Sequence, residues 1–76
     1  MMPMEAGLIV ADGDVQGIGR SVRLARKEAG LKQSDLADLA GVSERTVRAI
    51  ETGTGNPTLA AVVSVANVLG LHVVAA

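Results

Sequence analysis

Hydrophobic residues recur every three or four positions along most of this chain, the interval that predicts amphipathic helices. The pattern is sharpest from residue 33 to residue 53, QSDLADLAGVSERTVRAIETG, where it marks two short helices over 33–40 and 44–52. Gly41 supplies the permissive backbone that a tight turn between them needs, and Ser43 is the expected N-cap of the second helix. The apolar positions expected to face each other across this turn are Leu36, Ala37, Ala40, Val42, Val47 and Ile50.

The same periodicity predicts one further helix on each side of this pair. Upstream, apolar residues at helical spacing predict a helix that starts at its N-cap Asp14 and stops at Gly30. Downstream, Thr58 is the expected N-cap of a helix over residues 59–69. The predicted fold class is therefore all-α, a small helix-turn-helix domain of four helices.

Two short segments favour strands instead. Residues 72–75 are β-favouring, and Leu8-Ile9-Val10 is a weaker candidate near the start of the chain. We therefore expect an N-terminal arm over residues 1–13, the helical domain over 14–70 and a C-terminal strand segment over 71–76.

The chain carries no charged side chain from Thr52 to Ala76, and its last predicted helix is apolar almost all round. A surface helix of a monomer normally keeps a charged face, so this pattern predicts a homodimer in which the terminal strands also pair. A membrane span is the alternative, but polar residues interrupt the run and no basic or aromatic anchors flank it. The residues expected at the dimer interface are Val63, Ala66, Leu69, Leu71, His72, Val73 and Val74.

Composition points in the same direction. With 76 residues and no Cys, Phe, Trp or Tyr, the chain must build its core from small aliphatic side chains. A single core of this size supplies only ~3–5 kcal/mol of stability, so a second copy is the expected source of further buried surface. A secretory signal carries basic residues ahead of its apolar run, and no basic residue precedes the first apolar run here. A cytoplasmic protein is therefore expected.

The segment LIVADGDVQGIGR sets Gly13, Gly17 and Gly19 behind an apolar run, a spacing that resembles the cofactor loop of short-chain dehydrogenases. A working dinucleotide site also needs a parallel sheet and an acidic residue about 20 positions further on. The chain continues instead into a helical pattern and leaves too few residues for such a sheet. We expect no enzyme activity and no cofactor, and His72 stands alone in the sequence, so no metal site is expected either.

The spacing from residue 31 to residue 53, L-K-Q-x-x-L-A-x-x-A-G-V-S-x-x-T-V-x-x-I-E-x-G, resembles the phage repressor and Cro (XRE) family of helix-turn-helix regulators. The resemblance covers about residues 15–70 and implies a protein that binds an operator in double-stranded DNA. A net charge of −1 is unusual for that task, but all seven Lys and Arg residues lie between positions 20 and 48. The distribution of charge, rather than its total, is what favours DNA binding.

The resemblance also implies which residues touch DNA. The second helix of the pair is expected to read base edges in the major groove, with Arg45 donating two hydrogen bonds to a guanine. Glu44 has two interpretations: it accepts from a cytosine amino group, or it only complements the helix dipole. Arg20, Arg23 and Lys27 face either phosphate or only solvent. The DNA-binding set that we predict is Arg23, Lys32, Gln33, Ser43, Glu44, Arg45, Thr46, Arg48, Ala49 and Asn56.

Arg26 and Glu51 match a pair that forms a structural salt bridge in several members of the family. Two positions depart from the family pattern. Lys32 stands where Thr or Ser is usual, which gives up an N-cap worth ~1 kcal/mol but places a cation beside the DNA backbone. The loop TGTGNPT lacks basic residues, so it offers only amides, Thr54 and Asn56 to phosphates.

A fourth helix followed directly by a strand most resembles the HipB-type antitoxin branch of the family. That resemblance implies a homodimeric repressor on a palindromic operator, acting as the antitoxin of a type II toxin-antitoxin pair with a HipA-type kinase toxin as its partner. Two alternatives stay open: a stand-alone XRE regulator unrelated to a toxin, and an interaction module that neutralises a protein and binds DNA little.

Overall fold

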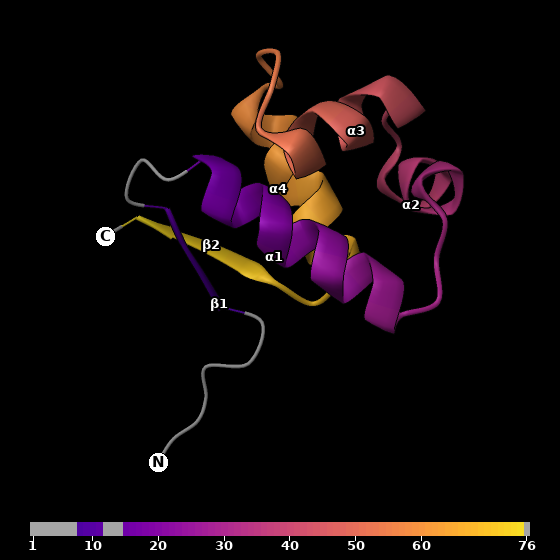
Figure 1. The fold of residues 1–76 in the computed structure, drawn as a ribbon, viewed down its shortest axis with the longest axis horizontal. Helices are drawn as coiled ribbons and strands as arrows, with labels where there is room; N and C mark the ends of the chain where they lie inside the picture. Colours follow the sequence, from indigo (N-terminus) through magenta and orange to yellow (C-terminus); the bar gives the residue numbers. More distant parts are fainter. Residues whose placement is uncertain (1–7, 12–14, 76) are drawn as a thin grey trace.

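The computed structural model describes residues 8–11 and 15–75, and within them four helices and two short strands follow one another (Figure 1). The helices are α1 (Val15–Glu28), α2 (Gln33–Ala40), α3 (Glu44–Thr52) and α4 (Leu59–Val68), and the strands are β1 (Leu8–Ala11) and β2 (His72–Ala75). The predicted all-α arrangement of four helices is confirmed. The predicted ranges of α2 and α3 match the structure, and α4 ends one residue earlier than predicted.

Short polar side chains and glycines set the helix ends. The Ser43 hydroxyl accepts a hydrogen bond from the Thr46 amide at 3.0 Å, and the Thr58 hydroxyl accepts one from the Ala61 amide at 3.1 Å. Both are the N-caps that the sequence predicts. Gly41 ends α2 at a φ of 71°, a left-handed conformation that glycine adopts without steric cost. The expected cap Asp14 lies outside the described residues.

All four helices contribute to one hydrophobic core. The core consists only of aliphatic side chains, as the composition requires, and the helix-turn-helix pair supplies half of its buried members. The partly buried Ala40 and Val42 pack against it. Its buried members are Val22, Leu36, Ala37, Val47, Ile50, Val65, Ala66 and Leu71.

α1 and α3 approach each other closely at Gly19. A Cβ atom at this position would clash with the carbonyl oxygen of Ile50 and lie 2.7 Å from that of Glu51, so only glycine fits here. Gly17 and Gly19 therefore lie within a helix, and neither forms the phosphate-binding loop of a dinucleotide site. Gly13 lies outside the described residues.

β1 and β2 pair with each other in parallel, from Leu8 opposite His72 to Ala11 opposite Ala75. The helical domain forms the crossover between them, so the two ends of the described chain run side by side (Figure 1). This pairing is within one chain, and it does not test the predicted pairing of β2 with a second copy. None of the described helices has the length and apolar character required to cross a membrane.

Candidate nucleic-acid interface

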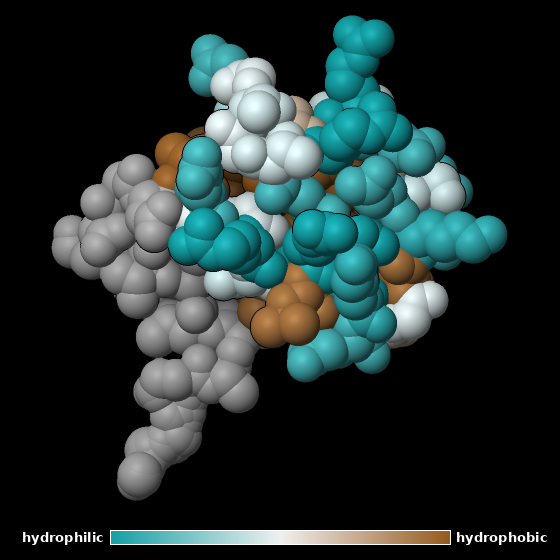
Figure 2. Space-filling view, viewed as in Figure 1, coloured by the Kyte–Doolittle hydropathy of each residue, from teal (hydrophilic) through white to brown (hydrophobic). Residues whose placement is uncertain are grey.

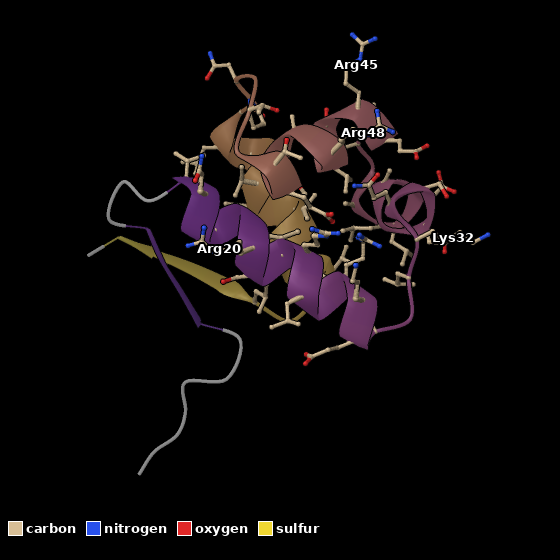
Figure 3. The ribbon with its side chains drawn as sticks, viewed as in Figure 1. Arg20, Lys32, Arg45 and Arg48 are labelled. Carbon is tan, nitrogen blue, oxygen red and sulfur yellow. The ribbon has the colours of Figure 1, made fainter. Side chains whose placement is uncertain are left out.

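The outer face of α3 is polar and exposed. The helix buries Val47, Ile50 and Glu51 against the rest of the domain. Glu44, Arg45 and Arg48 are exposed, while Thr46 and Ala49 are half-buried. Figure 3 shows Arg45 and Arg48 projecting outward from α3, and Figure 2 shows mainly hydrophilic residues over α2 and α3 on the same face.

Two hydroxyl groups form hydrogen bonds at the first turn of α3. Besides capping the Thr46 amide, the Ser43 hydroxyl lies 2.9 Å from the Thr46 hydroxyl and shares a hydrogen bond with it. The remaining free amides of this turn and the positive end of the helix dipole favour an anion in front of Ser43. The arrangement suits a phosphate group better than it suits direct base contact by Thr46.

The cations of α3 differ in their surroundings. Arg48 lies 3.5 Å from the Glu44 carboxylate, one helical turn away, and both side chains are at least half exposed. Arg45 forms no ion pair within the part of the chain that the structure describes. Arg45 is therefore the cation of α3 that is available to a ligand without first losing a partner.

A groove of about 390 Å³ separates α3 from the loop that follows it, and Arg45, Arg48 and Asn56 are among the residues that line it. Hydrogen bonds hold the start of this loop to α3. The Thr54 hydroxyl shares a hydrogen bond with the hydroxyl of Thr52, the last residue of α3, at 2.8 Å, and the Thr54 amide donates to the Ala49 carbonyl at 3.0 Å. Exposed Asn56 is thus held on the same side of the domain as the polar face of α3.

The start of α2 adds a cation to this surface, since Lys32 is exposed and points outward (Figure 3). Its side chain provides no cap, as predicted, but the Asp35 carboxylate accepts a hydrogen bond from the Lys32 amide at 2.9 Å. This is the reciprocal half of a capping box. The carboxylate three residues after Lys32 is a local sequence signal for this bond, and it was missed in the prediction.

A buried hydrogen-bonded network lies behind the interface. Arg26 donates to the Glu51 carboxylate through Nε at 2.6 Å and Nη2 at 3.1 Å, and through Nη1 to the Leu31 carbonyl at 2.8 Å. The predicted pairing of Arg26 with Glu51 is therefore present in the structure. The hydrogen bond to Glu51 raises the pKa of the Arg26 guanidinium above its ordinary value, although burial opposes this. Gln33 joins the network by donating from Nε2 to Glu51 at 3.2 Å.

Exposed Arg23 lies on α1 between two residues that face α3. It follows Gly19 by four positions and precedes Arg26 by three, and such neighbours share one side of a helix. The position therefore places Arg23 beside the interface. Arg20 and Lys27 are exposed too, and helical spacing turns them further from α3.

The predicted dimer residues are divided between surface and core. Val63 is exposed and Leu69 is half-buried, but Ala66 and Leu71 are buried in the core of the single chain. The side chains of residues 72–74 lie outside the described part of the structure. Val15 and Leu59 are absent from the predicted set, yet they are 57% and 72% exposed and line an apolar groove of about 280 Å³ between α1, α3 and α4.

No group of three or more His, Asp or Glu side chains arranged to hold a metal ion occurs among the described residues. The chemistry that this surface offers is hydrogen bonding and charge: guanidinium, ammonium, amide and hydroxyl groups around the free end of a helix. These groups match phosphates and the edges of bases.

Comparison with known proteins gives the same picture. A profile described as Helix-turn-helix matches residues 22–74. The chain is 41% identical over 49 residues to an uncharacterized HTH-type transcriptional regulator of Methanothermobacter thermautotrophicus. This alignment covers 64% of the chain and 71% of the relative. The chain is 38% identical over 56 residues to an uncharacterized HTH-type transcriptional regulator of Sinorhizobium fredii, which covers 74% of each.

Proposed function

Because the chain belongs to the XRE-type helix-turn-helix family, we propose that it is a sequence-specific, DNA-binding transcriptional repressor that acts as a homodimer on a palindromic operator. The observation that carries this proposal is the outer face of α3, where Arg45 is exposed and has no ion-pair partner among the described residues. α3 enters the major groove, and Arg45 donates to the O6 and N7 atoms of a guanine.

The groups around α3 position the domain on the phosphates. Ser43 and the first-turn amides of α3 bind one phosphate, and Lys32 together with the backbone amide of Gln33 at the start of α2 binds another. Arg23 and Asn56 extend the contact on the two flanks. Thr46 and Ala49 complete the surface that faces the groove, Thr46 through its methyl group because its hydroxyl is already bonded to Ser43.

Few cations serve this surface, and one of them, Arg48, is balanced by Glu44. Each neutralised phosphate contributes about 0.9 to the salt-dependence slope, so a single domain gains little from counterion release. Two domains on adjacent half-sites, about one helical turn or ~34 Å apart, double this contribution. The small charge of the interface is thus an argument for a dimer.

We place the dimer contact on α4 and its surroundings. α4 has no charged residue, its exposed side includes Leu59 and Val63, and Val15 lies across the apolar groove. The contact borders the interface with DNA, because Asn56 and Pro57 line both grooves. A second copy on this side holds two α3 helices in a fixed relation. β2 extends the same contact by strand pairing between copies.

Light scattering tests the dimer. The wild-type protein is expected to be a dimer at micromolar concentration, and Leu59→Glu or Val63→Glu is expected to give a folded monomer. Leu39→Glu is the matched control, because Leu39 on α2 is 63% exposed and lies outside the proposed contact. A monomeric wild type, or a control that dissociates as readily, contradicts the placement.

We further propose that the homodimer is the antitoxin of a HipA-type kinase toxin. The support is the order of elements, α4 followed closely by β2, which resembles the HipB-type branch. Co-expression with the neighbouring reading frame tests it: a kinase-like protein is expected to co-purify and to lose its toxicity. If the neighbouring reading frame encodes no kinase-like protein and this protein still regulates transcription, it is a stand-alone regulator.

A mobility-shift experiment with the upstream region of the protein's own gene tests the repressor proposal. A shift is expected that weakens with salt and is lost to specific competitor before random competitor. If neither the protein alone nor its complex with the toxin shifts any sequence selectively, the repressor proposal is wrong. Toxin neutralisation without such a shift would identify an interaction module instead.

A further inference from the structure

We propose that Glu44 and Arg48 act as one reading unit that selects a cytosine·guanine base pair in each half-site. The Glu44 carboxylate accepts from the cytosine N4 amino group, and the Arg48 guanidinium donates to the guanine of the same pair. This inference rests on the proposed function, because it names the sequence that the α3 surface prefers.

The geometry of the two side chains carries the argument. Arg48 Nη2 and Glu44 Oε2 lie 3.5 Å apart, on residues separated by one turn at the start of the exposed face of α3. In a cytosine·guanine pair, cytosine N4 donates to guanine O6, so these two major-groove atoms lie ~2.9 Å apart. An acceptor and a donor held at nearly this separation complement a donor and an acceptor on one base pair.

The chemistry of the base edges selects cytosine over the other bases. Thymine and guanine present acceptors that repel a carboxylate, and adenine sets its N7 acceptor beside its amino group. Cytosine alone presents an amino donor with no acceptor next to it. The guanine opposite offers O6 and N7, which is the pattern that a guanidinium recognises best.

Electrostatics gives the unit a role that Arg45 does not have. The paired charges of Glu44 and Arg48 cancel, so together they attract the phosphate backbone little, whereas Arg45 attracts it at every sequence. The ion pair is also weak, because the side chains of Arg48 and Glu44 are 58% and 50% exposed to solvent. It can therefore open and exchange its contacts for those of a base pair. Glu44 thus penalises sequences that leave its carboxylate without a donor.

The experiment compares the wild type with Glu44→Gln on duplexes recovered by selection from a random pool with the full chain. Every base pair of the selected half-site is replaced in turn, and each duplex is titrated with each protein. Glu28→Gln is the matched control, because it removes the same charge from an exposed carboxylate at the end of α1. Circular dichroism verifies that both variants fold.

The wild type is expected to show one position at which replacing cytosine·guanine weakens binding by about fivefold or more. Glu44→Gln is expected to weaken this preference and to tolerate adenine in place of cytosine, because an amide both donates and accepts while the Arg48 contact to guanine remains. The variant should keep the guanine preference set by Arg45 and bind random DNA more tightly. If Glu44 only complements the helix dipole, Glu44→Gln keeps every base preference, and the inference is wrong. If the wild type selects no sequence at all, the proposed function fails and the inference fails with it.

Discussion

The side-chain amide of Gln33 donates a hydrogen bond to the buried carboxylate of Glu51, 3.2 Å away. A carboxylate can only accept, so this contact fixes which end of the Gln33 amide turns inward. The same carboxylate binds Arg26 of α1. The start of α2, α1 and α3 are therefore joined at one buried charge directly behind the proposed contact with phosphate.

Glu51→Gln is expected to destabilise the domain by about 3–5 kcal/mol, because it leaves the Arg26 charge buried without its partner. A loss of this size is comparable to the whole stability of so small a core. Urea denaturation followed by far-ultraviolet circular dichroism measures it, since the chain has no Trp or Tyr. Glu44→Gln breaks an exposed pair and should cost no more than ~0.5 kcal/mol. Equal losses in the two variants would show that the buried pair has no special role.

Gly19→Ala is expected to destabilise the protein, and the sign of the effect is the test. In an exposed helix the same change stabilises by ~1 kcal/mol, because alanine is the better helix former. Here the added Cβ meets the backbone carbonyls of Ile50 and Glu51, which cannot move without separating α1 from α3. Thermal denaturation followed by circular dichroism is the measurement. A raised melting temperature would mean that α1 and α3 are not packed this closely.

Ser43→Ala and Thr58→Ala form a matched pair, because each removes the hydroxyl that caps a helix. Both variants should lose ~1 kcal/mol of stability. Only Ser43→Ala should also weaken DNA binding, since Ser43 faces the proposed phosphate and Thr58 caps α4. Fluorescence anisotropy with a labelled duplex gives the two affinities. Equal affinities for the two variants would remove Ser43 from the interface.

Lys32→Ala and Arg23→Ala should weaken binding to operator and random DNA by the same factor. Each should also lower the slope of log K against log salt by about 1.8, because the dimer loses one phosphate contact, worth about 0.9, at each of its two half-sites. Titrations at several salt concentrations measure this slope. A variant whose slope stays unchanged identifies a cation that faces solvent only.

Residues that strongly favour helix ends, together with the spacing of the aliphatic residues, made most of the fold predictable from sequence. Ser43, Thr58 and Gly41 set helix ends that the structure reproduces, and the aliphatic spacing identified the core of the helix-turn-helix pair. The site was predictable as a surface, because the outer positions of a helix follow from its buried ones.

What escaped prediction depends on tertiary packing or on one missed local motif. A glycine at position 19 fits both a cofactor loop and a close crossing of two helices, and only the approach of α3 in the folded chain distinguishes the two. Ala66 and Leu71 follow the same apolar pattern as Val63, yet they point into the chain's own core. The bond from Gln33 to Glu51 spans 18 residues, and no local pattern reveals it. The cap provided by Asp35 was the exception, since its spacing is visible in the sequence.

The most direct test of the central claim is the affinity of Arg45→Ala for the selected operator and for random DNA of equal length. Arg45 is exposed and carries no structural contact among the described residues, so this variant should fold normally. Losing the guanine contact should cost ~1–3 kcal/mol for each half-site of the operator and much less on random DNA. A loss of affinity that is equal for every sequence, or no loss at all, would contradict direct reading of DNA by α3.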